Sequence, residues 1–195
     1  MKKQTIFLAF AVLLSWCSDA AAQSAAMQAR MAEIRKCYAE AQKLAEDAMK
    51  GPKKNYMHVD FHTNDPNGYD HRTVDFFFDN SEILKELEVY PCQLVFVRDK
   101  SANVYTEYLF NKSDSELVFY YKRVNHPEEI YEQRFYFPPS GSGGEVWMTE
   151  KTTDAKTKKV VSEKQEVDEG AMCVWAYREA QAIRDTFGGM SVIFE

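Results

Sequence analysis

Between residues 55 and 167, apolar side chains recur at every second position in a series of short stretches, and this alternation strongly constrains the fold. It is typical of β-strands with one face buried and the other exposed to water. Turn-forming Asn, Asp, Gly, Pro and Ser residues separate the stretches, as in consecutive hairpins of one antiparallel sheet. The first two strands carry Met57, Val59 and Phe61, and then Val74, Phe76 and Phe78. Further strands are predicted over residues 84–90, 93–98, 104–110, 116–123, 130–137, 145–151 and 160–167. For the first of these, a short helix over residues 81–87 is the alternative.

Two stretches with helical periodicity flank the strands. Residues 25–49 place Met27, Met31, Ile34, Tyr38, Ala41, Ala45 and Ala48 on one apolar stripe. Gly51 and Pro52 then end the helix. A second helix is expected to begin near Asp168, a good N-cap residue, and to end at Gly188 and Gly189. Its apolar stripe comprises Cys173, Ala176, Ala180, Ile183 and Phe187. Residues 191–195 are compatible with a short closing strand.

The order of these elements predicts an α+β fold. We expect a curved antiparallel meander sheet of about 7–9 strands, packed by an N-terminal and a C-terminal amphipathic helix. The two helices are expected to cover the same face of the sheet.

The first residues have the pattern of a bacterial secretory signal. Lys2 and Lys3 precede an apolar run over residues 6–16, and alanines follow at positions 20–22. Cleavage after Ala22 would leave a single domain over residues 23–195, in the periplasm or outside the cell. The alternative is a lipoprotein anchored through Cys17, although the bulky Trp16 stands where a lipoprotein signal normally has a small residue. No later apolar run is long enough to span a bilayer.

The net charge and the cysteine content exclude some classes of function. A net charge of −6 repels phosphate backbones, so we do not expect a nucleic-acid partner. Beyond the signal, three cysteines remain, Cys37, Cys92 and Cys173, and an odd number leaves at least one thiol unpaired. None of them forms a Cys-x-x-Cys motif, and the sequence does not settle which of them pair, if any.

Several aromatic-rich segments end or open the predicted strands: YLFN at residues 108–111, ELVFYY at 116–121, EQRFYF at 132–137 and EVW at 145–147. Over about 40 residues this pattern resembles small exported proteins of Bacteroides-type bacteria. The resemblance implies a cell-envelope or secreted location, and it carries over no site residue.

One cluster of metal-ligating residue types stands out. Three of the four histidines, His58, His62 and His71, lie close in sequence, together with Asp60 and Asp70. His58 and His62 on one strand would be about 13 Å apart, too far to share a metal ion. If the two strands pair with His62 opposite His71, then Asp60, His62 and His71 share one face and form a candidate metal site. The alternative is that they belong to the solvated face of a half-exposed sheet.

The remaining motifs favour binding over catalysis. The sequence has no nucleophile elbow, phosphate-binding loop or His-Glu-x-x-His motif, so we predict no catalytic residue and no cofactor. Aromatic triplets such as residues 76–78 place rings on both faces of their strands, and rings on a second face need cover. The favoured hypothesis is a non-enzymatic exported module that binds a protein, a glycan or an apolar ligand. The alternative is a metal-assisted hydrolase that uses Asp60, His62 and His71.

Overall fold

The structure is a computed structural model that describes residues 4–50, 55–65, 68–79, 93–168 and 171–191. The chain divides into two compact units, Met1–Cys37 and Tyr38–Glu195. The predicted strand over residues 84–90, its helical alternative, and Cys92 lie outside the described residues. The predicted cleavage after Ala22 remains a prediction.

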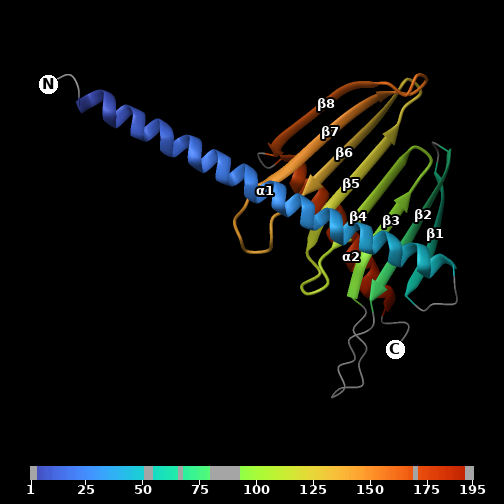
Figure 1. Cartoon of the computed structure of the whole chain (residues 1–195). Helices are drawn as coiled ribbons and strands as arrows, with labels where there is room; N and C mark the ends of the chain where they lie inside the picture. Colours follow the sequence, from blue (N-terminus) through green and yellow to red (C-terminus); the bar gives the residue numbers. More distant parts are fainter. Residues whose placement is uncertain (1–3, 51–54, 66–67, 80–92, 169–170, 192–195) are drawn as a thin grey trace, which may run out of the picture. The chain divides into compact units, whose positions relative to one another are not determined.

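The second unit is built on one antiparallel sheet whose eight strands follow one another in chain order (Figure 1). The strands are β1 (Tyr56–Asp65), β2 (Gly68–Asp79), β3 (Gln93–Lys100), β4 (Val104–Phe110), β5 (Leu117–Asn125), β6 (Glu129–Tyr136), β7 (Val146–Asp154) and β8 (Val160–Asp168). The predicted α+β class and meander topology are confirmed. Short connections, such as residues 101–103 between β3 and β4 and residues 126–128 between β5 and β6, favour hairpins, so strands that follow one another in the sequence pair in the sheet.

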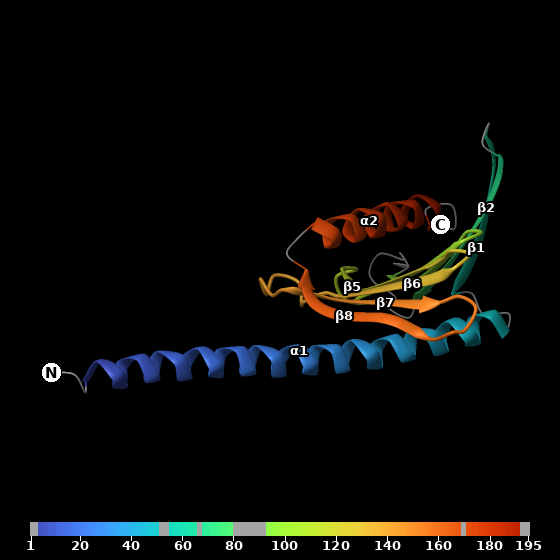
Figure 2. The same cartoon turned by 90° about the horizontal axis from the view of Figure 1, so that it is seen from above.

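Helix α2 (Ala171–Ser191) lies along one face of the sheet (Figure 2). Its predicted stripe is buried against the sheet: Cys173, Ala176, Ala180, Ile183 and Phe187 join a core that includes Phe76, Tyr108, Tyr120, Phe135 and Phe137. The expected end of this helix at Gly188 and Gly189 is wrong, because both glycines lie inside the helix. Each costs about 1 kcal/mol relative to alanine in a helix interior. The buried Phe187 just before them and the partly buried Met190 just after them pack on the core, which offsets that cost.

Helix α1 (Gln4–Lys50) ends where predicted, directly before Gly51. Its residues in the second unit contact the opposite face of the sheet. The Tyr38 ring lies 5.8 Å from the Phe96 ring and 5.3 Å from the Phe119 ring. Neither phenylalanine belongs to the core under α2. The expectation that both helices cover one face is therefore wrong. The reason is the aromatic triplets: successive residues point to opposite faces, so rings lie on both faces and both need cover.

A buried carboxylate ties this part of α1 to the sheet. Glu107 of β4, which is 2% exposed, accepts hydrogen bonds from the Tyr38 and Tyr105 hydroxyls, each at 2.5 Å. Nε of Arg98 lies 3.7 Å from the same carboxylate. The Arg98 guanidinium lies over the rings of Phe77 and Phe96, at 5.6 and 5.3 Å from their centroids. Burial and the Glu107 carboxylate raise the pKa of both tyrosines far above the usual range, which keeps both hydroxyls protonated as donors.

The two cysteines whose side chains the structure describes lie in different environments. Cys37 carries an exposed thiol, whereas Cys173 is buried among the core residues under α2. Within the described part of the chain, neither helix contains an apolar stretch of the length that a transmembrane helix needs.

Candidate functional site

Strands β1 and β2 extend beyond the rest of the sheet. β2 pairs with β3 only over residues 73–79, whereas its pairing with β1 continues to Gly68. Residues 60–65 and 68–73 thus form the outer end of a two-stranded hairpin, which bends away from the other strands (Figure 2). His62 lies directly opposite His71, so the register that the candidate metal site requires is present.

The structure brings the three predicted metal ligands together on the exposed face of this hairpin. One ligand atom from each of Asp60, His62 and His71 lies within 4.8 Å of the other two. Nε2 of His71 is 3.1 Å from Oδ1 of Asp60. The imidazole rings of His62 and His71 stack with their centroids 4.7 Å apart and their planes inclined by 6°. Two imidazoles and a carboxylate are a ligand set that zinc-type ions accept.

Another side chain of the predicted cluster, His58, lies beside this group. Its Nε2 is 3.3 Å from Oδ2 of Asp60, and its Nδ1 is 2.7 Å from Oδ1 of Asp75. The Tyr56 hydroxyl donates to the same Asp75 oxygen at 2.7 Å. The hydrogen bond to Asp75 raises the pKa of His58, and the hydrogen bond from His71 lowers the pKa of Asp60. His58 therefore orients the carboxylate of Asp60.

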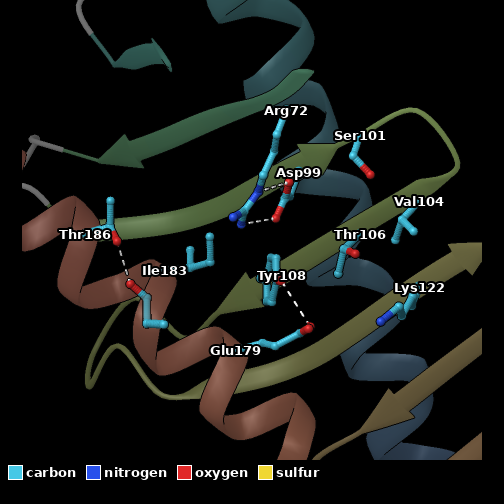
Figure 3. Close-up of a pocket in the computed structure, with 11 residues that line it drawn as sticks. Arg72, Asp99, Ser101, Val104, Thr106, Tyr108, Lys122, Glu179, Ile183 and Thr186 are labelled. Carbon is cyan, nitrogen blue, oxygen red and sulfur yellow. Dashed lines mark hydrogen bonds and ion pairs between the residues drawn. The ribbon is translucent and has the colours of Figure 1, made fainter. Parts of the chain in front are cut away.

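A second feature, which the sequence did not indicate, is a cleft of about 460 Å³ on the α2 face of the sheet (Figure 3). Its walls come from β2, β3, the β3–β4 turn, β4, β5 and α2. The lining residues are Arg72, Asp99, Ser101, Val104, Thr106, Tyr108, Lys122, Glu179, Ala182, Ile183 and Thr186. Hydroxyls, four charged groups and a few aliphatic side chains converge in a volume typical of small-molecule sites.

Two of the four charged groups form an ion pair with each other. Arg72 donates from Nε to Oδ1 of Asp99 at 2.8 Å and from a terminal nitrogen to Oδ2 at 2.6 Å. Figure 3 shows this fork at one end of the cleft. The bidentate geometry fixes the guanidinium plane and raises the pKa of Arg72. Neither group is left to neutralise a ligand.

The third charged group, Glu179 of α2, is held by tyrosines of the sheet. It accepts a hydrogen bond from the Tyr120 hydroxyl at 2.8 Å and a longer one from the Tyr108 hydroxyl at 3.4 Å. Burial, followed by the charge of Glu179, raises the pKa of both tyrosines far above the usual range. Both hydroxyls are therefore permanent donors, and the carboxylate has partners in the folded protein.

The fourth charged group, Lys122 of β5, differs from the other three. Its Nζ lies 3.7 Å from the centroid of the Trp175 ring, and it makes no hydrogen bond or ion pair with any residue that the structure describes. Burial lowers its pKa, an effect that Glu179 and Asp99 partly oppose at longer range. Lys122 is thus a partly desolvated ammonium whose donors point into the cleft without a partner.

These cleft residues could not be selected from the sequence because they come from β2, β3, β4, β5 and α2, and meet only through the sheet register. One signal was present. Glu179 lies between Ala176 and Ile183 at helical spacing, so a carboxylate flanks a stripe that is otherwise buried. A partly buried carboxylate needs partners, and Glu179 has them in the hydroxyls of Tyr120 and Tyr108.

Comparison with protein-family models, with curated proteins and with solved structures finds no match for this chain. The functional conclusion is therefore drawn from the geometry of the cleft and of the hairpin.

Proposed function

We propose that this protein is an exported, non-enzymatic binding module whose ligand occupies the cleft between α2 and strands β2–β5. The N-terminal signal pattern supports export to the periplasm or the medium, with a lipid anchor at Cys17 as the alternative. Among the described residues that line the cleft there is no histidine or cysteine. The lining thus lacks the side chains that most often act as general base or as an activated nucleophile.

The observation that carries this proposal is the unpartnered ammonium of Lys122. Arg72, Asp99 and Glu179 have partners within the protein, so Lys122 is the charged group of the cleft that a ligand would neutralise. A ligand that neutralises the Lys122 ammonium must carry a negative charge. Val104 and Ile183 offer apolar surface in the same cleft, and the Trp175 ring lies directly against Lys122. The ligand class is therefore a small carboxylate with an apolar body.

The metal-assisted hydrolase is the less favoured function. His71 and Arg72 are adjacent in β2 and so point to opposite faces of the sheet. Asp60, His62 and His71 do not line the cleft. A hydrolase would need its metal ion beside the bound substrate, and the arrangement of these two groups favours separate roles.

The test uses 3-phenylpropionate and its neutral amide, which has the same shape, as probes in isothermal titration calorimetry. We expect the carboxylate to bind about 10–100-fold more tightly, since a charge-assisted hydrogen bond contributes about 1.5–3 kcal/mol. In Lys122→Met this preference should disappear. In the control Lys164→Met, which removes an exposed lysine of β8, it should remain. Equal binding of both probes by the unmodified protein would contradict the proposal.

A further inference from the structure

A second site lies on the opposite face of β2, and it does not depend on the cleft. We propose that Asp60, His62 and His71 bind one zinc-type divalent transition-metal ion, and that this ion clamps the outer end of the β1–β2 hairpin. The three ligands come from both strands, so one ion would bridge them.

The distances suit a metal ion of this size. Metal–ligand bonds of about 2.0–2.1 Å in tetrahedral geometry place neighbouring ligand atoms about 3.3 Å apart. The separation of 3.1 Å between Nε2 of His71 and Oδ1 of Asp60 already matches this value. All three ligand atoms lie within 4.8 Å, and His62 is exposed, so rotation of its side chain brings the third ligand into range. The metal then replaces the hydrogen-bonded proton between His71 and Asp60, and water completes the coordination.

The ligands are also oriented by a second layer of side chains, as in established metal sites. His58 contacts Oδ2 of Asp60, the oxygen that is not directed to His71. Asp75 holds the other ring nitrogen of His58, and Tyr56 in turn donates to Asp75. This chain fixes the Asp60 carboxylate with Oδ1 turned toward the histidines. His58 is therefore a positioning residue.

The hairpin explains what the ion would do. Residues 68–72 of β2 pair with β1 but not with β3. A two-stranded hairpin without further strands is only marginally stable in water. An ion that binds only the paired form favours pairing by a factor of about 100 at a concentration 100 times its Kd. The site would therefore convert a locally opening hairpin into a closed one.

The chain offers its own matched control, because His126, the fourth histidine, lies at the exposed turn between β5 and β6. Zinc chloride is titrated into metal-free protein by calorimetry. We expect one ion per chain, with affinity reduced at least about tenfold in Asp60→Asn, His62→Ala and His71→Ala, and about 10–100-fold in His58→Gln. His126→Ala should bind as the unmodified protein does.

Two further measurements on the unmodified protein do not depend on the folding of any variant. Zinc should shift the imidazole nitrogen resonances of His62 and His71 but not those of His126. Hydrogen exchange of the amides in residues 60–64 and 69–72 should slow by about 100-fold at a zinc concentration 100 times the Kd. The proposal is overturned if zinc leaves both imidazoles unchanged, or if binding is equally strong in all the ligand variants.

Discussion

The carboxylate of Glu107 offers the sharpest test of what holds α1 to the sheet. Replacing Glu107 by alanine removes the acceptor of two tyrosine hydrogen bonds and the counter-ion of Arg98 in a fully buried place. Removing one partner of a buried charged pair costs about 3–5 kcal/mol. We therefore expect the free energy of unfolding to fall by about 3–5 kcal/mol in Glu107→Ala. In Glu107→Gln, which can still accept hydrogen bonds, it should fall by about 1–3 kcal/mol.

Glu132 provides the matched control, because it has the same kinds of partner with more water around it. It accepts a hydrogen bond from Tyr121 and lies 3.6 Å from Arg134, and its side chain is 17% exposed. The water that reaches this partly exposed pair screens its charges, so the pair contributes less than a buried one, and Glu132→Ala should cost only about 1 kcal/mol. Equilibrium urea unfolding, followed by tryptophan fluorescence, measures both values. If Glu107→Ala were no more costly than Glu132→Ala, the argument from burial would be wrong.

Two other predictions concern Lys122 and the N-terminus. Lys122→Met should stabilise the protein at pH 7, because methionine keeps a favourable contact with Trp175 and avoids burying a charge. Since the folded pKa of Lys122 lies below 10.5, the unfolded chain binds more protons between the two pKa values. The difference in the free energy of unfolding between Lys122→Met and the unmodified protein should therefore shrink as the pH rises from 7 toward 10.5. Urea unfolding at pH 7 and at pH 10.5 measures this difference, and an equal difference at the two pH values would contradict the prediction. For the N-terminus, intact-mass measurement of protein from its native host should find Gln23 as the first residue, whereas a lipidated Cys17 would establish the alternative anchor.

Strand positions were predictable because turn chemistry and period-two alternation act locally. The prediction for residues 104–110 coincides with β4, and those for β5 to β8 differ from the structure by at most three residues at either end. The pairing of His62 with His71 was only the condition for the candidate metal site, and the register of β1 and β2 meets that condition. What failed was the placement of α1, because periodicity shows that a helix has an apolar stripe but not which sheet face will cover it.

The cleft needed information that no local pattern contains. Arg72 and Asp99 lie in neighbouring strands, but their separation in sequence includes the whole segment 80–92. In the sequence, Lys122 is an ordinary polar position in an alternating strand, and only its surroundings in the fold, the Trp175 ring and the cleft, distinguish it from other lysines. The function of such side chains depends on which residues lie beside them in neighbouring strands. It can therefore be inferred only when the register of the sheet is known.

Both proposed sites depend on one register, that of β2. Val74 and Phe76 are almost fully buried under α2, and this burial fixes which residues of β2 face the helix. The same alternation turns Arg72 toward the cleft and His71 toward Asp60 on the other face. A slip of one residue would expose both apolar side chains and exchange the two polar ones. The apolar core under α2 therefore positions the proposed anion-binding cleft on one face of the strand and the proposed metal-binding cluster on the other.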